Sequence, residues 1–172
     1  CFFGSWFLVF HLSLPPMSNP LPHDHIIPYK DSSKDKKAQV AEMFDNIAGQ
    51  YDHLNRFLSA RIDISWRKKA IRQLKEDHPA CILDVATGTA DMAILACKML
   101  KPEKVEGIDI SANMLELGRK KVEKEGLVDK IRLQSGDSET INFADNTFDA
   151  VMVAFGVRNF ENLEKGLSEM RR

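Results

Sequence analysis

The sequence predicts an α/β fold with an open, mostly parallel sheet and helices on both faces. An apolar run, 81–85, leads through a turn of small residues into the helical pattern DMAILACKML, which indicates a strand–turn–helix unit. The segment KVEGIDI has the composition of a second strand, and it ends at Asp109, about 20 residues after the turn. A third run, FDAVMVAFGV, is continuously apolar, which is typical of a central strand covered on both faces.

The N-terminal residues differ in composition from the rest. Residues 1–16, CFFGSWFLVFHLSLPP, are too short to span a bilayer and lack the basic start and cleavage site of a signal peptide. We expect a non-native extension, with translation starting at Met17; a truncated export signal or membrane anchor is the alternative. Residues 17–38 are polar and proline-rich, and we expect a flexible N-terminus there. One domain is expected over 39–172, with its incomplete α/β core at 79–172.

A helical cap is expected over residues 39–78, ahead of the sheet. From Lys34 onward apolar residues recur at helical spacing and leave the charged residues on the other face. We expect this helix to break or bend near Gly49, and a second helix to run from Ile64 to Leu74. Packing on a sheet edge explains the apolar positions, but it gives less reason for polar groups such as Tyr51.

Charge and cysteine content exclude several classes of protein. The net charge of −1 provides no basic field to attract nucleic acid. The chain has three cysteines, an odd number, and none of them are in a CxxC spacing (Cys1, Cys81 and Cys97). This argues against a disulfide framework or a zinc site. A reducing cytosol is the natural setting for such a chain.

The turn after the first core strand favours a nucleotide smaller than a dinucleotide. Gly88 is its only glycine, followed by a threonine and Ala90, whereas a pyrophosphate-binding turn uses three glycines. S-adenosylmethionine, with its amino-acid tail, suits such a turn, although a plain strand–helix junction would look similar. Asp109 can accept hydrogen bonds from ribose hydroxyls, and backbone N–H groups would face the ligand. Asp84 is placed to orient the amides of the turn.

The remaining elements have clear boundaries. Pro102 ends the first core helix, and Ser111 is a suitable N-cap for a helix that ends at Gly126. The segment KIRLQSG then forms a third strand and runs into Asp137 and Ser138. Gly-Asp-Ser is good turn chemistry, but a loop at the carboxyl edge of a parallel sheet is also where a nucleotide base would lie.

Five segments resemble the class I S-adenosylmethionine-dependent methyltransferases, and more narrowly the C-methyltransferases of menaquinone and ubiquinone biosynthesis. They are MFDNIAGQYDHLNRFLSARIDISWRKKAI, LDVATGTAD, GIDISANML, GDSETINFADNTFDAV and AFGVRNF. YDHLNRFLS and AFGVRNF are specific to the quinone branch. The resemblance implies a Rossmann-like sheet in the order 3-2-1-4-5-7-6, of which only strands 3-2-1-4 are encoded. We therefore expect a C-terminally truncated core in which strand 4 is an unprotected edge.

The resemblance also assigns residues to a cofactor site. It implies that Gly88 and Thr89 contact S-adenosylmethionine directly and that Asp109 binds its ribose. Asp137 would accept a hydrogen bond from the adenine amino group, and the backbone N–H of Ser138 would donate to a ring nitrogen.

An acceptor site is implied beside it, under the helical cap. Many methyltransferases of nucleic-acid amino groups end the fourth strand with an Asn/Asp-Pro-Pro-aromatic motif, and this chain has AFGVRNF instead. Arg158 is the candidate partner for a quinol oxyanion, while Asn159 and Tyr51 are candidates for orienting the quinol. Because the sulfonium is a good leaving group, we expect neither a metal nor a covalent nucleophile.

The predicted reaction is C-methylation of demethylmenaquinol to menaquinol, the final step of menaquinone biosynthesis. The TGTAD turn resembles the menaquinone-only members more closely, and the corresponding step in ubiquinone biosynthesis is the alternative. Another small-molecule methyltransferase and a non-catalytic binding module also remain open. The expected partner is a polyprenylated quinol, met in transient contact with the membrane surface by a cytoplasmic protein peripheral to its inner face. No nucleic-acid partner is expected, and a homo-oligomer is left open.

Overall fold

The computed structural model describes residues 7–9, 28, 34–58 and 62–172, without the side chains of residues 7–9 and 52–62. Most of the expected extension and flexible N-terminus therefore lies outside the described residues. The elements in chain order are β1 (Phe7–Val9), α1 (Lys36–Leu58), α2 (Ile62–Gln73), β2 (Cys81–Val85), α3 (Asp91–Leu100), β3 (Lys104–Asp109), α4 (Ala112–Lys124), β4 (Ile131–Ser135), β5 (Ala150–Ala154), a 3-10 turn (Val157–Asn159) and α5 (Leu163–Arg171).

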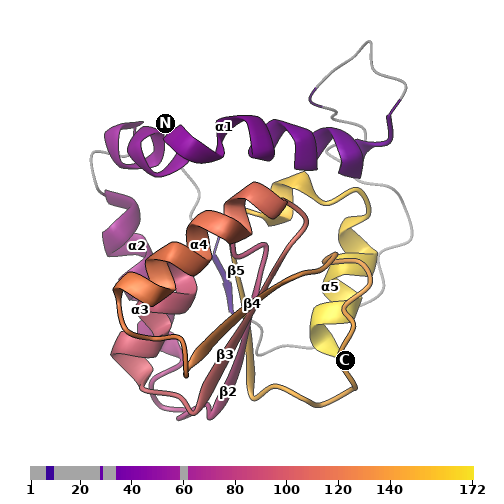
Figure 1. The fold of residues 1–172 in the computed structure, drawn as a ribbon. Coiled ribbons are helices and arrows are strands. Elements are labelled where there is room, and N and C mark those ends of the chain that lie inside the picture. Colours follow the sequence, from indigo (N-terminus) through magenta and orange to yellow (C-terminus); the bar gives the residue numbers. More distant parts are fainter. Residues whose placement is uncertain (1–6, 10–27, 29–33, 59–61) are drawn as a thin grey trace.

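The sheet has the order β1-β5-β2-β3-β4 (Figure 1). Strands β5, β2, β3 and β4 are parallel to one another, and β1 pairs antiparallel with β5. The predicted strands 1, 2, 3 and 4 are β2, β3, β4 and β5. Starting from the β4 edge, the sheet therefore has the predicted order 3-2-1-4, and the predicted topology is confirmed.

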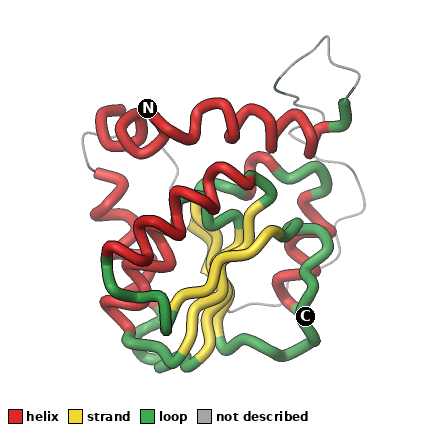
Figure 2. The backbone as a smooth tube through the Cα atoms, viewed as in Figure 1, coloured by secondary structure: helices red, strands yellow, loops and turns green. Residues whose placement is uncertain are grey.

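Helices lie on both faces of the sheet (Figure 2). Alternating side chains along the strands form two apolar cores, one on each face. Ile82 and Met152 point to the core shared with α2, α3 and α4. Their neighbours Leu83 and Val153 point to the core shared with α5 and the segment that precedes β5. This period of two within apolar runs is expected of strands buried on both faces.

The predicted ends of the core helices are confirmed. The Ser111 hydroxyl accepts the N–H of Met114 at 3.2 Å and so caps α4. The same helix ends at Lys124, and Gly126 follows two residues later with a φ of 67°, the left-handed conformation that glycine favours. Helix α3 ends one residue before Lys101, and Pro102 follows.

Helix α1 does not break at Gly49, and this prediction was wrong. Asp35 caps the helix by accepting the N–H of Ala38 at 2.8 Å, so it begins at Lys36 and runs unbroken to Leu58. A glycine in a helix interior costs only about 1 kcal/mol relative to alanine. Burial of neighbours such as Ala48 offsets that cost. Helix α2 begins at Ile62, two residues before its predicted start.

The edge of β5 is covered, which corrects the expectation of an open edge. Strand β1 pairs with it antiparallel, with Phe7 opposite Ala154 and Val9 opposite Met152. Strand β5 itself is shorter than predicted, because Phe155 adopts a left-handed φ of 63° and the chain then enters the 3-10 turn.

No helix in the described part of the chain is long and apolar enough to cross a membrane.

Helix α1 lies across one end of the sheet and packs along α4 (Figure 1). One carboxylate oxygen of Asp45 accepts the Ser111 hydroxyl at 2.6 Å and the N–H of Asn113 at 3.0 Å. These bonds tie the middle of α1 to the first turn of α4. The helix is thereby held over the carboxyl ends of the parallel strands.

Candidate functional site

A pocket lies between α1 and the carboxyl ends of the four parallel strands. It contains about 710 Å³ of empty space, its open mouth included. All of the predicted site residues except Thr89 line it: Tyr51, Gly88, Asp109, Asp137, Ser138, Arg158 and Asn159. Tertiary structure thus brings together residues from five separate segments.

The turn after β2 exposes its backbone to this pocket. Every second residue is left-handed, with φ of 53° at Ala86, 55° at Gly88 and 65° at Ala90. A methyl group built at Gly88 would meet no atom within 4 Å, so a ligand can approach the backbone there. Left-handed alanines cost roughly 1–2 kcal/mol each, and such strain is common at ligand sites.

Asp109 ends β3 and faces the same space. Its Oδ2 accepts the backbone N–H of Gly88 at 2.8 Å, and its Oδ1 accepts the N–H of Ser111 at 2.9 Å. Burial raises the pKa of this carboxyl, although the two N–H donors oppose the shift. Because each carboxylate oxygen can accept two bonds, acceptor capacity is left over for ligand hydroxyls.

Asp84 supports the turn from below rather than from within the pocket. It is 1% exposed, and it accepts the hydroxyl of Thr87 at 2.7 Å instead of an amide of the turn, which corrects the predicted contact. Burial raises the pKa of Asp84 to about 7. The backbone N–H of Thr87 in turn donates to the carbonyl of Ile108 at 3.0 Å, so the turn is fixed to β3 as well.

Thr89 lies elsewhere than predicted. Its side chain is buried and does not line the pocket, and its hydroxyl accepts a bond from Lys121 of α4 at 3.0 Å. Lys121 also pairs with Asp91, the first residue of α3. The Thr89 hydroxyl therefore joins the turn to α4, and Thr89 is not among the residues that line the pocket.

The acceptor candidates line the same pocket. Arg158 sits in the 3-10 turn, and its exposed guanidinium has no hydrogen-bond or ion-pair partner among the described residues. Asn159 lines the pocket beside it. Tyr51 reaches in from α1, where its ring makes an edge contact with Phe44 at a centroid distance of 5.8 Å. A cation, an amide and a phenol are therefore available to an acceptor molecule.

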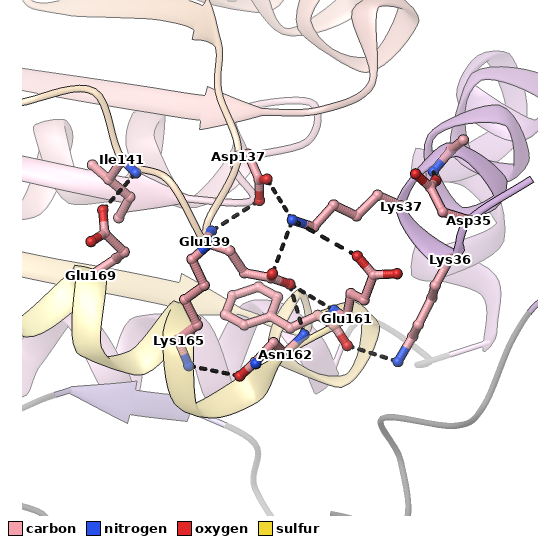
Figure 3. Close-up of polar contacts among 12 residues, drawn as sticks. Asp35, Lys36, Lys37, Asp137, Glu139, Ile141, Glu161, Asn162, Lys165 and Glu169 are labelled. Atoms are coloured by element: carbon pink, nitrogen blue, oxygen red, sulfur yellow. Dashed lines mark hydrogen bonds and ion pairs between the residues drawn. The ribbon is translucent and has the colours of Figure 1, made fainter. Parts of the chain in front are cut away.

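Sequence reasoning missed several lining residues. Phe155 and Gly156 follow β5 directly, so their position at a strand end was a usable signal. Lys37 was also missed; its Nζ lies 2.7 Å from Asp137 and 2.9 Å from Glu139. Figure 3 shows these contacts between α1 and the loop after β4. Nothing in the charged run DSSKDKK distinguishes this lysine from its neighbours.

The described residues contain no group of three or more His, Cys, Asp or Glu side chains arranged to hold a metal ion. The side chains that line the pocket include carboxylates, one lysine, one arginine, a phenol, a hydroxyl and an amide, together with apolar groups. This donor set is suited to an organic ligand with hydroxyl and amino groups.

Solved structures share the fold. A protein from Methanococcus maripaludis, assigned as an S-adenosyl-L-methionine-dependent methyltransferase, has a TM-score of 0.60 at 20% identity and matches 84% of this chain and 62% of its own. A SAM-dependent methyltransferase from Aquifex aeolicus has a TM-score of 0.51 at 26% identity, over 59% of this chain and 56% of its own. The predicted Rossmann-like class I methyltransferase fold is confirmed.

Curated relatives are more similar in sequence. A demethylmenaquinone methyltransferase from Bacteroides fragilis is 57% identical over 88% of this chain, and one from Porphyromonas gingivalis is 46% identical over 87%. A ubiquinone/menaquinone biosynthesis C-methyltransferase from Geotalea daltonii is 44% identical over 80%. The chain spans 61% of the first two relatives and 59% of the third. The sequence profile described as the ubiE/COQ5 methyltransferase family matches residues 30–172, and the chain therefore belongs to that family.

Proposed function

We propose that the protein catalyses S-adenosylmethionine-dependent C-methylation of demethylmenaquinol to menaquinol. The observation that carries the proposal is the guanidinium of Arg158, which has no partner among the described residues and lies in a pocket that Gly88 and Asp109 also line. The names of the two Bacteroides and Porphyromonas relatives support the menaquinone acceptor. Methylation in ubiquinone biosynthesis is the second candidate, since the Geotalea relative carries both quinones in its name at lower identity.

The residues at one end of the pocket fit S-adenosylmethionine. The open space at Gly88 lets a ligand approach the protein backbone closely. The Asp109 carboxylate can still accept hydrogen bonds from the hydroxyls of a ribose. Asp137 and Ser138 line the wall where we place the adenine. The co-substrate would supply a methyl group on a positively charged sulfur, so the protein needs to bind it and orient it.

At the other end, the chain has to orient the quinol and stabilise negative charge on it. A ring carbon becomes a better nucleophile when the neighbouring hydroxyl loses its proton. We assign Arg158 to the resulting oxyanion, because a preorganised cation in a pocket stabilises such charge. Tyr51 and Asn159 would hold the ring in line with the methyl group, and correct positioning can contribute about 7–11 kcal/mol. The apolar wall that includes Phe44 suits the ring itself.

The remaining assignments follow from the same acceptor. A polyprenylated quinol resides in the bilayer, so we place the protein in the cytoplasm, in transient contact with the inner face of the membrane. We expect no nucleic-acid partner and leave open whether the protein forms a homo-oligomer.

The test replaces Arg158 in the full-length protein and follows methyl transfer to demethylmenaquinol under reducing conditions. Arg158→Ala should lower kcat by about 10²–10³-fold and leave the affinity for S-adenosylhomocysteine nearly unchanged. Arg158→Lys should recover little, because an ammonium lacks the planar guanidinium. Tyr51→Phe should be milder. Arg72→Ala, an exposed arginine on α2 outside the pocket, is the matched control.

Two results would count against the proposal. A wild-type kcat in Arg158→Ala across a range of pH would remove this residue from the mechanism. A wild-type protein that binds S-adenosylhomocysteine but transfers no methyl group to demethylmenaquinol would refute the proposed acceptor, and a benzoquinol acceptor would then be assayed next.

A further inference from the structure

Two lysines in the first turn of α1 hold this helix against segments 100 or more residues later in the chain. Lys36 Nζ donates to the carbonyl of Phe160 at 2.7 Å. Lys37 Nζ lies 2.7 Å from Asp137, 2.9 Å from Glu139 and 3.9 Å from Glu161 (Figure 3). Lys36 is buried away from the pocket, whereas Lys37 and its three acidic partners all line it.

The three carboxylates around Lys37 are not equally fixed. The Glu139 side chain is 4% exposed, and its Oε1 accepts the backbone N–H groups of Glu161 and Asn162 at 2.9 and 2.8 Å. The Asp137 side chain is 30% exposed, and among the described residues its carboxylate accepts, apart from Lys37, the N–H of Glu139 at 2.9 Å. Glu161 is 40% exposed and lies farther from Lys37. Of the two carboxylates in direct contact with Lys37, Asp137 is therefore less firmly held than Glu139.

Lys37 remains a cation throughout the physiological range. Burial alone would lower the pKa of its ammonium, but the hydrogen bonds to Asp137 and Glu139 outweigh burial and raise the pKa above its ordinary value. Without this cation, Asp137 would face two uncompensated carboxylates, Glu139 and Glu161. Like charges at such distances repel, and the Asp137 carboxylate, which is less firmly held than that of Glu139, would turn away from them toward solvent.

We infer that Lys37 is a positioning residue that holds the Asp137 carboxylate against the pocket, where it accepts a hydrogen bond from the exocyclic amine of the co-substrate's base. The inference rests on the proposed function, because it requires an aminopurine ligand. It assigns to Lys37 a part in discrimination between bases. A ligand with a carbonyl in place of the amine would present an acceptor to a fixed carboxylate, and the two acceptors would repel.

The experiment measures the Kd of two ligands for the full-length protein by calorimetry. The ligands are S-adenosylhomocysteine and S-inosylhomocysteine, which differ in the amine at position 6 of the base. Lys37→Met should weaken binding of S-adenosylhomocysteine by about tenfold, the scale of one hydrogen bond to a charged group. Binding of S-inosylhomocysteine should change much less, so the ratio of the two affinities falls. Lys37→Arg should keep most of the ratio.

Lys34→Met is the matched control. Lys34 lies just before α1, pairs with Glu42 at 2.9 Å in an exposed position, and does not line the pocket. The Lys34→Met variant loses the same positive charge from the same end of α1. Its ratio of affinities for the two ligands should stay at the wild-type value. The ratio compares two ligands on one protein sample, so a lower fraction of folded protein does not change it.

A cycle with Asp137→Asn then tests whether Lys37 acts through Asp137. On the Asp137→Asn background, Lys37→Met should cause little further change in the ratio, because residues that act through one contact are non-additive. Equal loss of affinity for both ligands in Lys37→Met, or an undiminished effect on the Asp137→Asn background, would overturn the inference. If the wild-type protein bound neither ligand, the proposed function itself would fail.

Discussion

The backbone N–H of Gly88 donates to Oδ2 of Asp109 at 2.8 Å, and this bond joins the turn after β2 to the end of β3. The two residues lie 21 positions apart in the chain, and both line the pocket. The bond fixes the distance between a turn that is open to a ligand and a carboxylate that retains acceptor capacity. A nucleoside can therefore contact both without rearrangement of the backbone.

Replacing this carboxylate should weaken cofactor binding. Asp109→Ala removes the acceptor for the ribose and also the partner of the Gly88 N–H. The expected loss of affinity for S-adenosylhomocysteine is about 1.5–3 kcal/mol, the scale for hydrogen bonds to a charged group. Calorimetry on the full-length protein measures it, with Asp129→Ala, an exposed carboxylate outside the pocket, as the control. An unchanged Kd would mean that the ribose lies elsewhere.

Two glycine-to-alanine substitutions should have opposite effects on stability. A methyl group on Gly156 would lie 2.4 Å from the Cβ of Ala86, where β5 and β2 run side by side. Gly156→Ala should therefore lower the free energy of unfolding by about 1–3 kcal/mol, the usual scale of overpacking. A methyl group on Gly49 would meet no atom within 4 Å.

The matched Gly49→Ala should raise the free energy of unfolding by about 0.5–1 kcal/mol, because alanine is the better helix former. Urea denaturation of both variants measures these changes. Shifts of the same sign would contradict the close approach of Gly156 to Ala86.

The burial of Asp84 should appear as a pH dependence of stability. Its folded-state pKa is about 7 and its ordinary value is 3.8. Between these values the folded protein keeps a proton that the unfolded chain has lost. This group therefore lowers the free energy of unfolding as pH rises through the window, and its effect levels off above pH 7. Burial is the main cause, and the nearby charge of Arg67 opposes it while that of Asp109 adds to it.

Asp84→Asn removes this titration. The free energy of unfolding of the variant, relative to wild type, should rise by about 2–3 kcal/mol between pH 5 and pH 8. Loss of the bond from Thr87 would add only a constant offset, and other titrating groups cancel in the difference. Urea denaturation at several pH values measures it, with Asp129→Asn as the exposed control. A flat difference would show that Asp84 titrates near its ordinary pKa.

Local signals in the sequence were sufficient for most of the fold. Apolar runs and their periodicity identified the four parallel strands, and Ser111 and Gly126 marked the ends of α4 correctly because capping depends on residues only a few positions apart. The same local logic placed Asp109 at a strand end. Since the carboxyl ends of parallel strands meet at one edge, it also predicted that Gly88, Asp109 and Asp137 lie together in one pocket.

Only the tertiary structure decided contacts between distant segments. The side chain of Thr89 turns to Lys121 on α4, β1 covers β5, and Lys37 reaches Asp137 across 100 positions of the chain. None of these follows from a local pattern, because each depends on which surfaces the packed helices and strands bring together. A charged residue at the start of a helix looks the same in sequence whether it is solvated or paired, and its partners exist only once the chain has folded.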